Sequence, residues 1–242
     1  MDLSVVIPAR NEAPNVAPLI AEIRHALDGR LSYEIVYVDD GSADGTAAEA
    51  RRLAAEFPGL RLVRHQASCG QSMAILTGVK AARADWIATL DADGQNDPAD
   101  IARLWEIAHA APASPSLMVA GQRQKRRDTW SKRWASHAAN AIRRGLLGDG
   151  TPDTGCGLKL FPRNLFLEMP RFDHMHRFLP ALTLRQGGRV VSVTVNHRPR
   201  EHGQSNYGVF DRLWVGIADL LGVMWLMRRA KSPIVIEDPP PA

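Results

Sequence analysis

An acidic cluster follows a short apolar run near the middle of the chain. Asp91 and Asp93 come directly after Trp86–Leu90, which we expect to form a buried strand. Alternate residues of an extended chain point the same way, so both carboxylates can face one site. With Gln95 they offer the hard oxygen ligands that Mg²⁺ or Mn²⁺ prefers, and a metal held this way can bridge to a diphosphate. The alternative is an acidic turn that caps a helix beginning at Pro98.

The first half of the chain alternates apolar runs with helical patterns, which is typical of an α/β fold with a mostly parallel sheet. The expected strands are Leu3–Ile7, Glu34–Val38, Arg61–Val63, Trp86–Leu90 and Leu117–Ala120. The expected helices lie at about Asn15–Leu27, Gly45–Glu56, Gln71–Ala82 and Pro98–Ala108. Polar clusters follow three of the strands, at 10–12, 39–42 and 91–93. Because ligands bind at this edge of open α/β sheets, we expect a nucleotide site there.

Composition narrows the classes of partner. The 242 residues carry 30 Lys and Arg against 26 Asp and Glu, a net charge of +4 that suits anionic membranes, polyphosphate substrates or nucleic acid. We see no aromatic-and-basic platform and no helix-turn-helix pattern, which argues against nucleic acid.

Two cysteines, Cys69 and Cys156, indicate a reduced compartment and no disulfide. No signal peptide is visible, because the first residues pass directly into a strand.

The second half is less regular and ends in an apolar segment. Glycines at 155 and 157 suggest a tight turn before a short strand, and Arg189–Val195 alternates as a strand. Leu213–Met227 reads as an apolar helix of about 22 Å, short of the roughly 30 Å that a membrane span needs. We expect either an interfacial helix anchored by Trp214 and Trp225, or a helix buried in the protein or in a dimer interface.

Five motifs together resemble the family-two glycosyltransferases of the GT-A fold, within them the dolichyl- or polyprenyl-phosphate sugar transferases. They are Val5–Glu12, Val38–Thr46, Leu90–Gln95, Asp153–Gly157 and Arg200–Ser205. The resemblance spans residues 3 to 210. It implies a GT-A nucleotide-sugar transferase domain at 1–210. Beyond it, the residues themselves predict an apolar, membrane-interfacial helix at 211–230 and a Pro-rich tail at 231–242.

The resemblance also implies roles for single residues. Pro8, Arg10 and Glu12 would line the nucleoside pocket, and Asp40 would accept hydrogen bonds from the base or ribose. Many relatives carry an aromatic residue where Arg10 stands, although a guanidinium can also lie flat on a base. Asp91, Asp93 and Arg123 would be catalytic, and Asp91, Asp93 and Gln95 would hold Mg²⁺ or Mn²⁺. Asp91, Ala92, Asp93 and Arg123 would also bind the donor. Arg200 and Ser205 would lie on a flexible loop that closes over the donor phosphates.

One absence bears on the acceptor. Transferases that act on sugar hydroxyls need a general base, often in a Glu-Asp pair, and Phe172–Phe178 offers neither that pair nor a Gln-x-x-Arg-Trp pattern. His174 and His176 in this segment are either site residues or ordinary surface or core histidines. A phosphate acceptor is already an anion and needs no base, so the missing base fits a polyprenyl-phosphate acceptor. The family resemblance implies transfer with inversion, and we expect a hexose, such as mannose or glucose, to move from a GDP- or UDP-sugar to this acceptor.

We expect the protein to lie in the cytoplasm and to attach peripherally to the anionic inner face of the cell membrane. The sequence is also compatible with a homo-oligomer. One alternative is a glycosyltransferase that acts on a sugar hydroxyl of a lipid-linked or surface glycan. Another is a non-catalytic protein that binds nucleotide sugars. Intact Asp91, Asp93, Gln95 and Arg123 argue against the second alternative.

Overall fold

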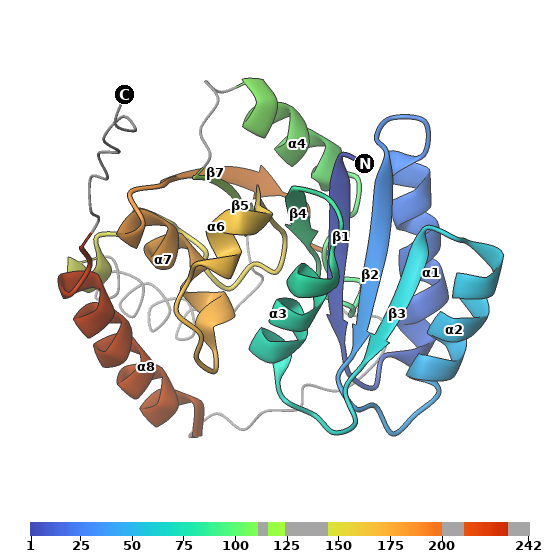
Figure 1. Ribbon diagram of the computed structural model, residues 1–242, viewed down its shortest axis with the longest axis horizontal. Helices are drawn as coiled ribbons and strands as arrows, with labels where there is room; N and C mark the ends of the chain where they lie inside the picture. Colours follow the sequence, from blue (N-terminus) through green and yellow to red (C-terminus); the bar gives the residue numbers. More distant parts are fainter. Residues whose placement is uncertain (111–115, 124–144, 200–210, 232–242) are drawn as a thin grey trace, which may run out of the picture.

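A computed structural model describes residues 1–110, 116–123, 145–199 and 211–231 (Figure 1). Its core is a seven-stranded sheet with the order β3-β2-β1-β4-β6-β5-β7. The strands are β1 (Leu3–Ala9), β2 (Tyr33–Asp39), β3 (Leu60–Arg64), β4 (Trp86–Thr89), β5 (Leu117–Arg123), β6 (Lys159–Pro162) and β7 (Arg189–Val195). Each expected strand is present, and β7 begins and ends where its alternation predicted. The mostly parallel sheet is therefore confirmed.

One strand runs against the others. β6 lies between β4 and β5 and pairs antiparallel with both, whereas the remaining neighbours pair in parallel. Its first residue, Lys159, is opposite Thr89 on β4 and Ala120 on β5. An antiparallel strand starts where its neighbours end, so β6 delivers Lys159 to the edge at which β4 finishes.

Alternation along the strands sorts their side chains to two faces of the sheet. On β1, Val5 and Ile7 pack in one hydrophobic cluster, and Val6 packs in the other. The first cluster takes up residues of α1 (Ala13–Leu27), α2 (Thr46–Glu56) and α4 (Asp100–Ala110). The second takes up residues of α3 (Gln71–Ala81), α6 (Arg163–Leu167), the 3₁₀ helix at Met175–Arg177, α7 (Leu179–Arg185) and α8 (Asp211–Arg228).

The four helices expected in the first half are confirmed, each within two residues at either end. α3 lies very close to the sheet, because a Cβ on Gly78 would collide with Val6 and approach Val38 to 3.1 Å. A glycine at this position lets the helix backbone pack directly on β1 and β2. We did not predict α6 or α7, which are short and have no clear apolar periodicity.

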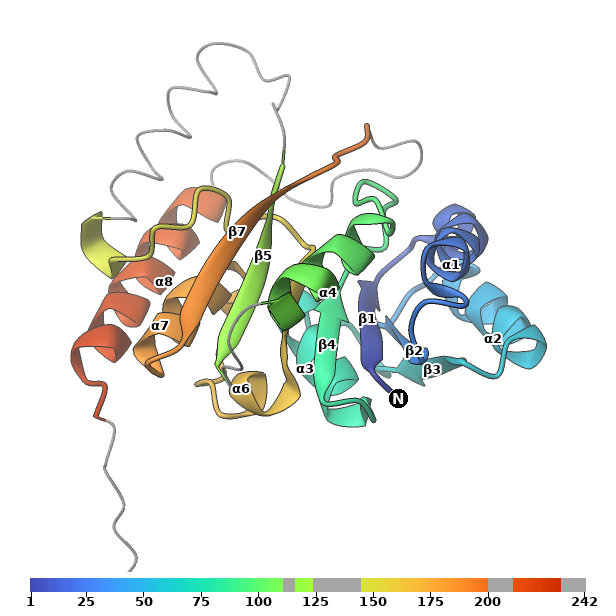
Figure 2. The same ribbon diagram turned by 90° about the horizontal axis from the view of Figure 1, so that it is seen from above.

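α8 packs one face on the protein and leaves the other exposed. Val223 is 1% exposed and joins the second cluster, while Arg185 Nε on α7 donates to Leu226 O at 3.1 Å. Both views place α8 beside α7, at the end of the molecule beyond β7 (Figure 2). On the other face Leu221 is 53% exposed and Trp225 59% exposed. Among the described helices, none combines the length and the apolar character needed to span a membrane.

Candidate active site

A cavity of about 510 Å³ opens at the edge where β1, β2 and β4 end. It collects residues that are far apart in sequence, because the carboxyl ends of parallel strands meet at one edge of a sheet. The predicted site residues that line it are Pro8, Arg10, Glu12, Asp40, Asp91, Ala92, Asp93 and Arg123. Gln95 is not among the lining residues, and Arg200 and Ser205 lie outside the described residues.

Asp91 and Asp93 both line this cavity. Burial raises the pKa of Asp91 to about 6, and the nearby charge of Asp93 adds to the rise. Gln71 Nε2 donates to Asp91 Oδ1 at 2.9 Å and fixes the orientation of the carboxylate. The backbone N–H of Gln95 donates to Asp93 Oδ1 at 3.1 Å. Two carboxylates that repel each other at a partly buried position are the environment that a divalent cation relieves.

Gly157 leaves room for Asp91. A Cβ at position 157 would overlap the Asp91 carboxyl group, so that carboxylate occupies the space of the missing side chain. Thr89 Oγ1 donates to Gly157 O at 2.7 Å and ties this turn to the end of β4. The carboxylate is thus held against the backbone of Gly157, and both residues line the cavity. This cradle and the oxygen-only donor set fit Mg²⁺ or Mn²⁺.

Basic groups line another part of the same cavity. Lys159 is 4% exposed, and its ammonium donates to Cys156 O. Burial lowers the pKa of Lys159, against the opposing effect of anionic neighbours that include Asp91. Arg123 makes a two-pronged ion pair with Asp153, at 2.6 Å from Nε and 2.7 Å from Nη2. The hydrogen bonds of Asp153 raise the pKa of Arg123 and fix its guanidinium in the wall of the cavity.

At the end of β2, Asp40 is already fully hydrogen-bonded. Oδ1 lies 2.7 Å from His65 Nδ1 and accepts from Cys69 N at 2.8 Å, while Oδ2 accepts from Ser68 Oγ at 2.8 Å and Gly70 N at 2.9 Å. Burial alone would raise the pKa of Asp40, but these bonds hold it below its usual range. A carboxylate has about four lone-pair sites. A base or ribose can therefore bond to Asp40 only if one of the present partners gives way.

Gln95 connects the acidic turn to the segment that follows β7. Its Nε2 donates to Arg198 O at 3.3 Å, and Arg198 N donates to Gln95 O at 2.9 Å. Arg198 also pairs with Asp97 at 2.9 Å and with Glu22 at 2.7 Å. The chain that leads into residues 200–210 is thus anchored on the turn that carries Asp91 and Asp93. Whether Gln95 ligates a metal stays a prediction.

The sequence did not single out several residues that line the cavity, among them Gln71, Lys159 and Arg177. A signal existed for Lys159, because it is the one charged residue in the otherwise apolar run Leu158–Phe161. For Gln71 and Arg177 the sequence offers no such sign. Their place depends on how α3 and the 3₁₀ helix pack against the sheet.

A comparison with protein families decides the classification. The pattern of the family described as "Glycosyl transferase family 2" matches residues 4–169. The chain belongs to this family. As a family-two glycosyltransferase it is 34% identical over 240 residues to a dodecaprenyl-phosphate galacturonate synthase of Rhizobium johnstonii, covering 96% of this chain and 69% of that protein. It is 37% identical over 210 residues to an undecaprenyl-phosphate 4-deoxy-4-formamido-L-arabinose transferase of Edwardsiella ictaluri, covering 86% of this chain and 63% of the relative.

The expected resemblance to polyprenyl-phosphate sugar transferases is thereby confirmed, and this family-two chain spans 63 to 69% of the length of those two relatives. The sugars in their names are neither mannose nor glucose. Among solved structures, glucosyl-3-phosphoglycerate synthase from Mycobacterium tuberculosis, in complex with Mn²⁺, UDP and glucosyl-3-phosphoglycerate, has a TM-score of 0.66 at 18% identity. The match covers 96% of this chain and 81% of that one and confirms the GT-A fold.

Proposed function

We propose that this chain transfers a sugar from a nucleotide diphosphate sugar to a polyprenyl phosphate, with a divalent cation held by Asp91 and Asp93. The observation that carries the proposal is the composition of the cavity, where this carboxylate pair lies together with Lys159 and Arg177. Such a site can hold a metal-bound diphosphate and a second phosphate group at once. The relatives named for transfer to dodecaprenyl and undecaprenyl phosphate support the choice of acceptor.

The reaction we propose is a single displacement that inverts the configuration at the anomeric carbon. A phosphate oxygen of the acceptor attacks that carbon, the bond to the donor's diphosphate breaks, and the nucleoside diphosphate leaves with the bonding electrons. Mg²⁺ or Mn²⁺, when bound, acts as a Lewis acid that offsets charge on the leaving diphosphate. Pro8, Arg10, Glu12 and Asp40 hold the nucleoside, and Arg123 orients the diphosphate.

The acceptor needs no general base in this scheme. A phosphate monoester loses its second proton at about pH 6, so it is already a nucleophile at neutral pH. His176 is the histidine among the described lining residues, and burial, with the nearby positive charges of Lys159 and Arg177, lowers its pKa to about 3. A general base works best with a pKa near the operating pH. His176 is therefore poorly suited to deprotonate a sugar hydroxyl, which favours the phosphate acceptor.

α8 is the element that we propose to contact the membrane. Ile217, Leu221 and Trp225 recur at four-residue spacing on its exposed face, and the exposed Arg228 and Arg229 lie at its C-terminal end. Apolar side chains beside basic ones suit the boundary between acyl chains and anionic headgroups. His174 Nδ1 lies 3.0 Å from Asp219 Oδ2, so α8 is also tied to the segment that contributes His176 and Arg177 to the cavity. This arrangement suits peripheral attachment to the inner face of the cell membrane.

A panel of radiolabelled donors tests the proposal. GDP- and UDP-linked hexoses, UDP-galacturonate and a UDP-linked 4-formamido-arabinose are each incubated with a short polyprenyl phosphate and Mn²⁺. We expect one donor to label the lipid phosphate, and no donor to label the matched polyprenol, which lacks the phosphate. Transfer to a sugar hydroxyl would instead establish the glycan-extending alternative. Donor binding with neither transfer nor hydrolysis would establish a non-catalytic binding protein.

A further inference from the structure

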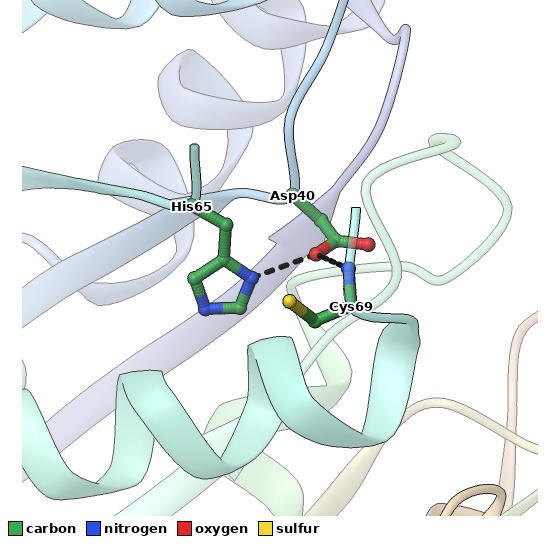
Figure 3. A group of neighbouring side chains, drawn as sticks. All are labelled: Asp40, His65 and Cys69. Carbon is green, nitrogen blue, oxygen red and sulfur yellow. Dashed lines mark hydrogen bonds and ion pairs between the residues drawn. The ribbon is translucent and has the colours of Figure 1, made fainter. Parts of the chain in front are cut away.

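A second cluster of potential metal ligands lies beside the nucleoside end of the cavity. Asp40, His65 and Cys69 each offer one ligand atom, and these atoms all lie within 4.8 Å of one another (Figure 3). Asp40 follows β2, His65 follows β3, and Cys69 precedes α3. Asp40 is buried and Cys69 is exposed, so the cluster can be reached from solvent.

The donor set differs from that of the acidic turn. Asp91 and Asp93 offer oxygen alone, whereas this cluster combines a carboxylate, an imidazole and a thiol. That combination is typical of Zn²⁺ sites, and thiolate disfavours Mg²⁺. We propose that Asp40 Oδ1, His65 Nδ1 and Cys69 Sγ bind one Zn²⁺, at a site separate from the carboxylate pair and with a fourth position open to water.

Zinc binding requires the three ligand atoms, now within 4.8 Å of one another, to move to the separations of a tetrahedral site, about 3.6 Å where sulfur is one of the pair. Asp40 Oδ1 and His65 Nδ1 are 2.7 Å apart and share a hydrogen, and two ligands on a tetrahedral Zn²⁺ would be separated by about 3.3 Å. Asp40 Oδ1 keeps its bond from Cys69 N, because the ion replaces only the bond with His65. Among the described residues, the Cys69 thiol donates only to Ala67 O, at 3.4 Å, and a weak hydrogen bond of this kind leaves the sulfur available as a ligand.

Protons balance in the binding step. The thiol of Cys69 loses its proton to solvent, and the imidazole of His65 takes the tautomer that carries hydrogen on Nε2. Thr77 Oγ1 lies 2.9 Å from that Nε2 and can accept this hydrogen. A metal-ligating histidine commonly donates its second N–H in this way, which fixes the ring and its tautomer. Thr77 therefore already supplies the outer contact that such a site requires.

Zinc at this site would hinder binding in the proposed nucleoside pocket. Ser68 and Gly70, on either side of Cys69, line the cavity with Asp40. A Cβ on Gly41 would come within 2.6 Å of Ser68 N, so this loop already packs tightly on the residue after Asp40. An ion that joins Cys69 to Asp40 would hold the loop closed and keep Asp40 from turning to a base or ribose. This consequence, unlike the zinc site itself, rests on the proposed function.

Cobalt substitution tests the site without donor or acceptor. The full chain, freed of metal and reduced, is titrated with Co²⁺ in the presence of excess Mg²⁺, which occupies oxygen-only sites. We expect one equivalent of Co²⁺ to produce a thiolate-to-cobalt charge-transfer absorption that one equivalent of Zn²⁺ removes. The chain has two cysteines. Cys69→Ser should abolish this absorption, and the matched variant Cys156→Ser should retain it.

The remaining ligands give graded effects. His65→Gln should lower the affinity for Co²⁺ at least about tenfold, and Thr77→Val should lower it about 10- to 100-fold with the absorption preserved. Absence of the absorption in the unaltered chain overturns the proposal, as does its survival in Cys69→Ser or its loss in Cys156→Ser. For the pocket, one equivalent of Zn²⁺ should weaken binding of UDP or GDP in Mg²⁺ buffer, and Cys69→Ser should remove that effect. Equal nucleotide affinity with and without Zn²⁺ overturns the coupling.

Discussion

Ser72 and His176 are 104 residues apart in sequence, yet Ser72 Oγ lies 2.7 Å from His176 Nδ1 and accepts from His176 N at 3.3 Å. The pair joins the first turn of α3 to the 3₁₀ helix and seats the imidazole in the cavity wall. Burial, with Lys159 and Arg177 nearby, lowers the pKa of His176 to about 3. The imidazole is therefore neutral at physiological pH in the folded protein.

This relationship predicts a pH-dependent loss of stability. In the unfolded chain His176 binds a proton below a pKa of about 6.5, while the folded chain does not until about pH 3. The stability that the neutral His176 imidazole contributes to the folded chain is fully present above a pH of about 6.5. It is lost as the pH falls toward about 3, by at most about 1.4 kcal/mol for each pH unit. Urea unfolding at pH 7 and pH 5 should therefore show a smaller stability loss in His176→Gln than in the unaltered chain.

His25 provides the matched control, because it is an exposed histidine on α1. His25→Gln should lose as much stability between pH 7 and pH 5 as the unaltered chain. If His176→Gln and His25→Gln behave alike, the buried neutral imidazole does not cause the pH dependence.

A second prediction concerns the carboxylate pair. Asp93→Asn removes one of the two charges that we propose to hold the cation and should lower transfer well over about tenfold, which corresponds to about 1.4 kcal/mol of transition-state stabilisation. The fold should survive, since Asp93 lies on the cavity rim. Asp85→Asn, an exposed change just before the opposite end of β4, should retain full activity. Undiminished turnover by Asp93→Asn, or full activity in excess chelator, would contradict a metal at this pair.

A third prediction uses the cradle at Gly157. Gly157→Ala places a Cβ where the Asp91 carboxyl group lies, so Asp91 must move or the turn must open. We expect transfer to fall at least about tenfold and the apparent metal affinity to fall with it. Gly150→Ala is the matched control, because a Cβ there meets nothing within 4 Å. Steady-state rates over a Mn²⁺ titration measure both effects, and equal rates for the two variants would show that the close approach at Gly157 is unimportant.

The sequence predicted those parts of the site that local pattern determines. Asp91 and Asp93 could be placed because they follow an apolar strand, and Asp40 could be placed for the same reason. Lys159 could not, because its position depends on β6 entering the sheet between β4 and β5 in the opposite direction, a tertiary arrangement that no local periodicity reports. The contact of Gln71 with Asp91 likewise depends on where α3 packs.

The C-terminal helix shows the same limit. Its apolar character and approximate ends were predicted, but the sequence allowed both an interfacial and a buried helix. The structure shows that Val223 is buried and Leu221 is exposed on the same helix. A helix apolar all round has no periodic signal that tells the two faces apart, so the division comes from contacts with α7 and the second hydrophobic cluster.

The final prediction tests the exposed face of α8 by single substitutions. Truncating the helix would also remove the buried Val223, so a change at Leu221, which is 53% exposed, is cleaner. Burying the exposed half of a leucine in a membrane contributes about 1 kcal/mol, or about fivefold in affinity. Leu221→Glu should therefore lower the affinity for anionic vesicles, measured by sedimentation, at least about fivefold, because it removes the apolar contact and adds a charge that the vesicle surface repels. The far-ultraviolet circular dichroism spectrum should stay unchanged. Leu221→Met, which keeps the site apolar, should sediment like the unaltered chain, and high salt should release part of both. If the unaltered chain ignores anionic vesicles, or if Leu221→Glu sediments as well as Leu221→Met, this face does not contact the membrane.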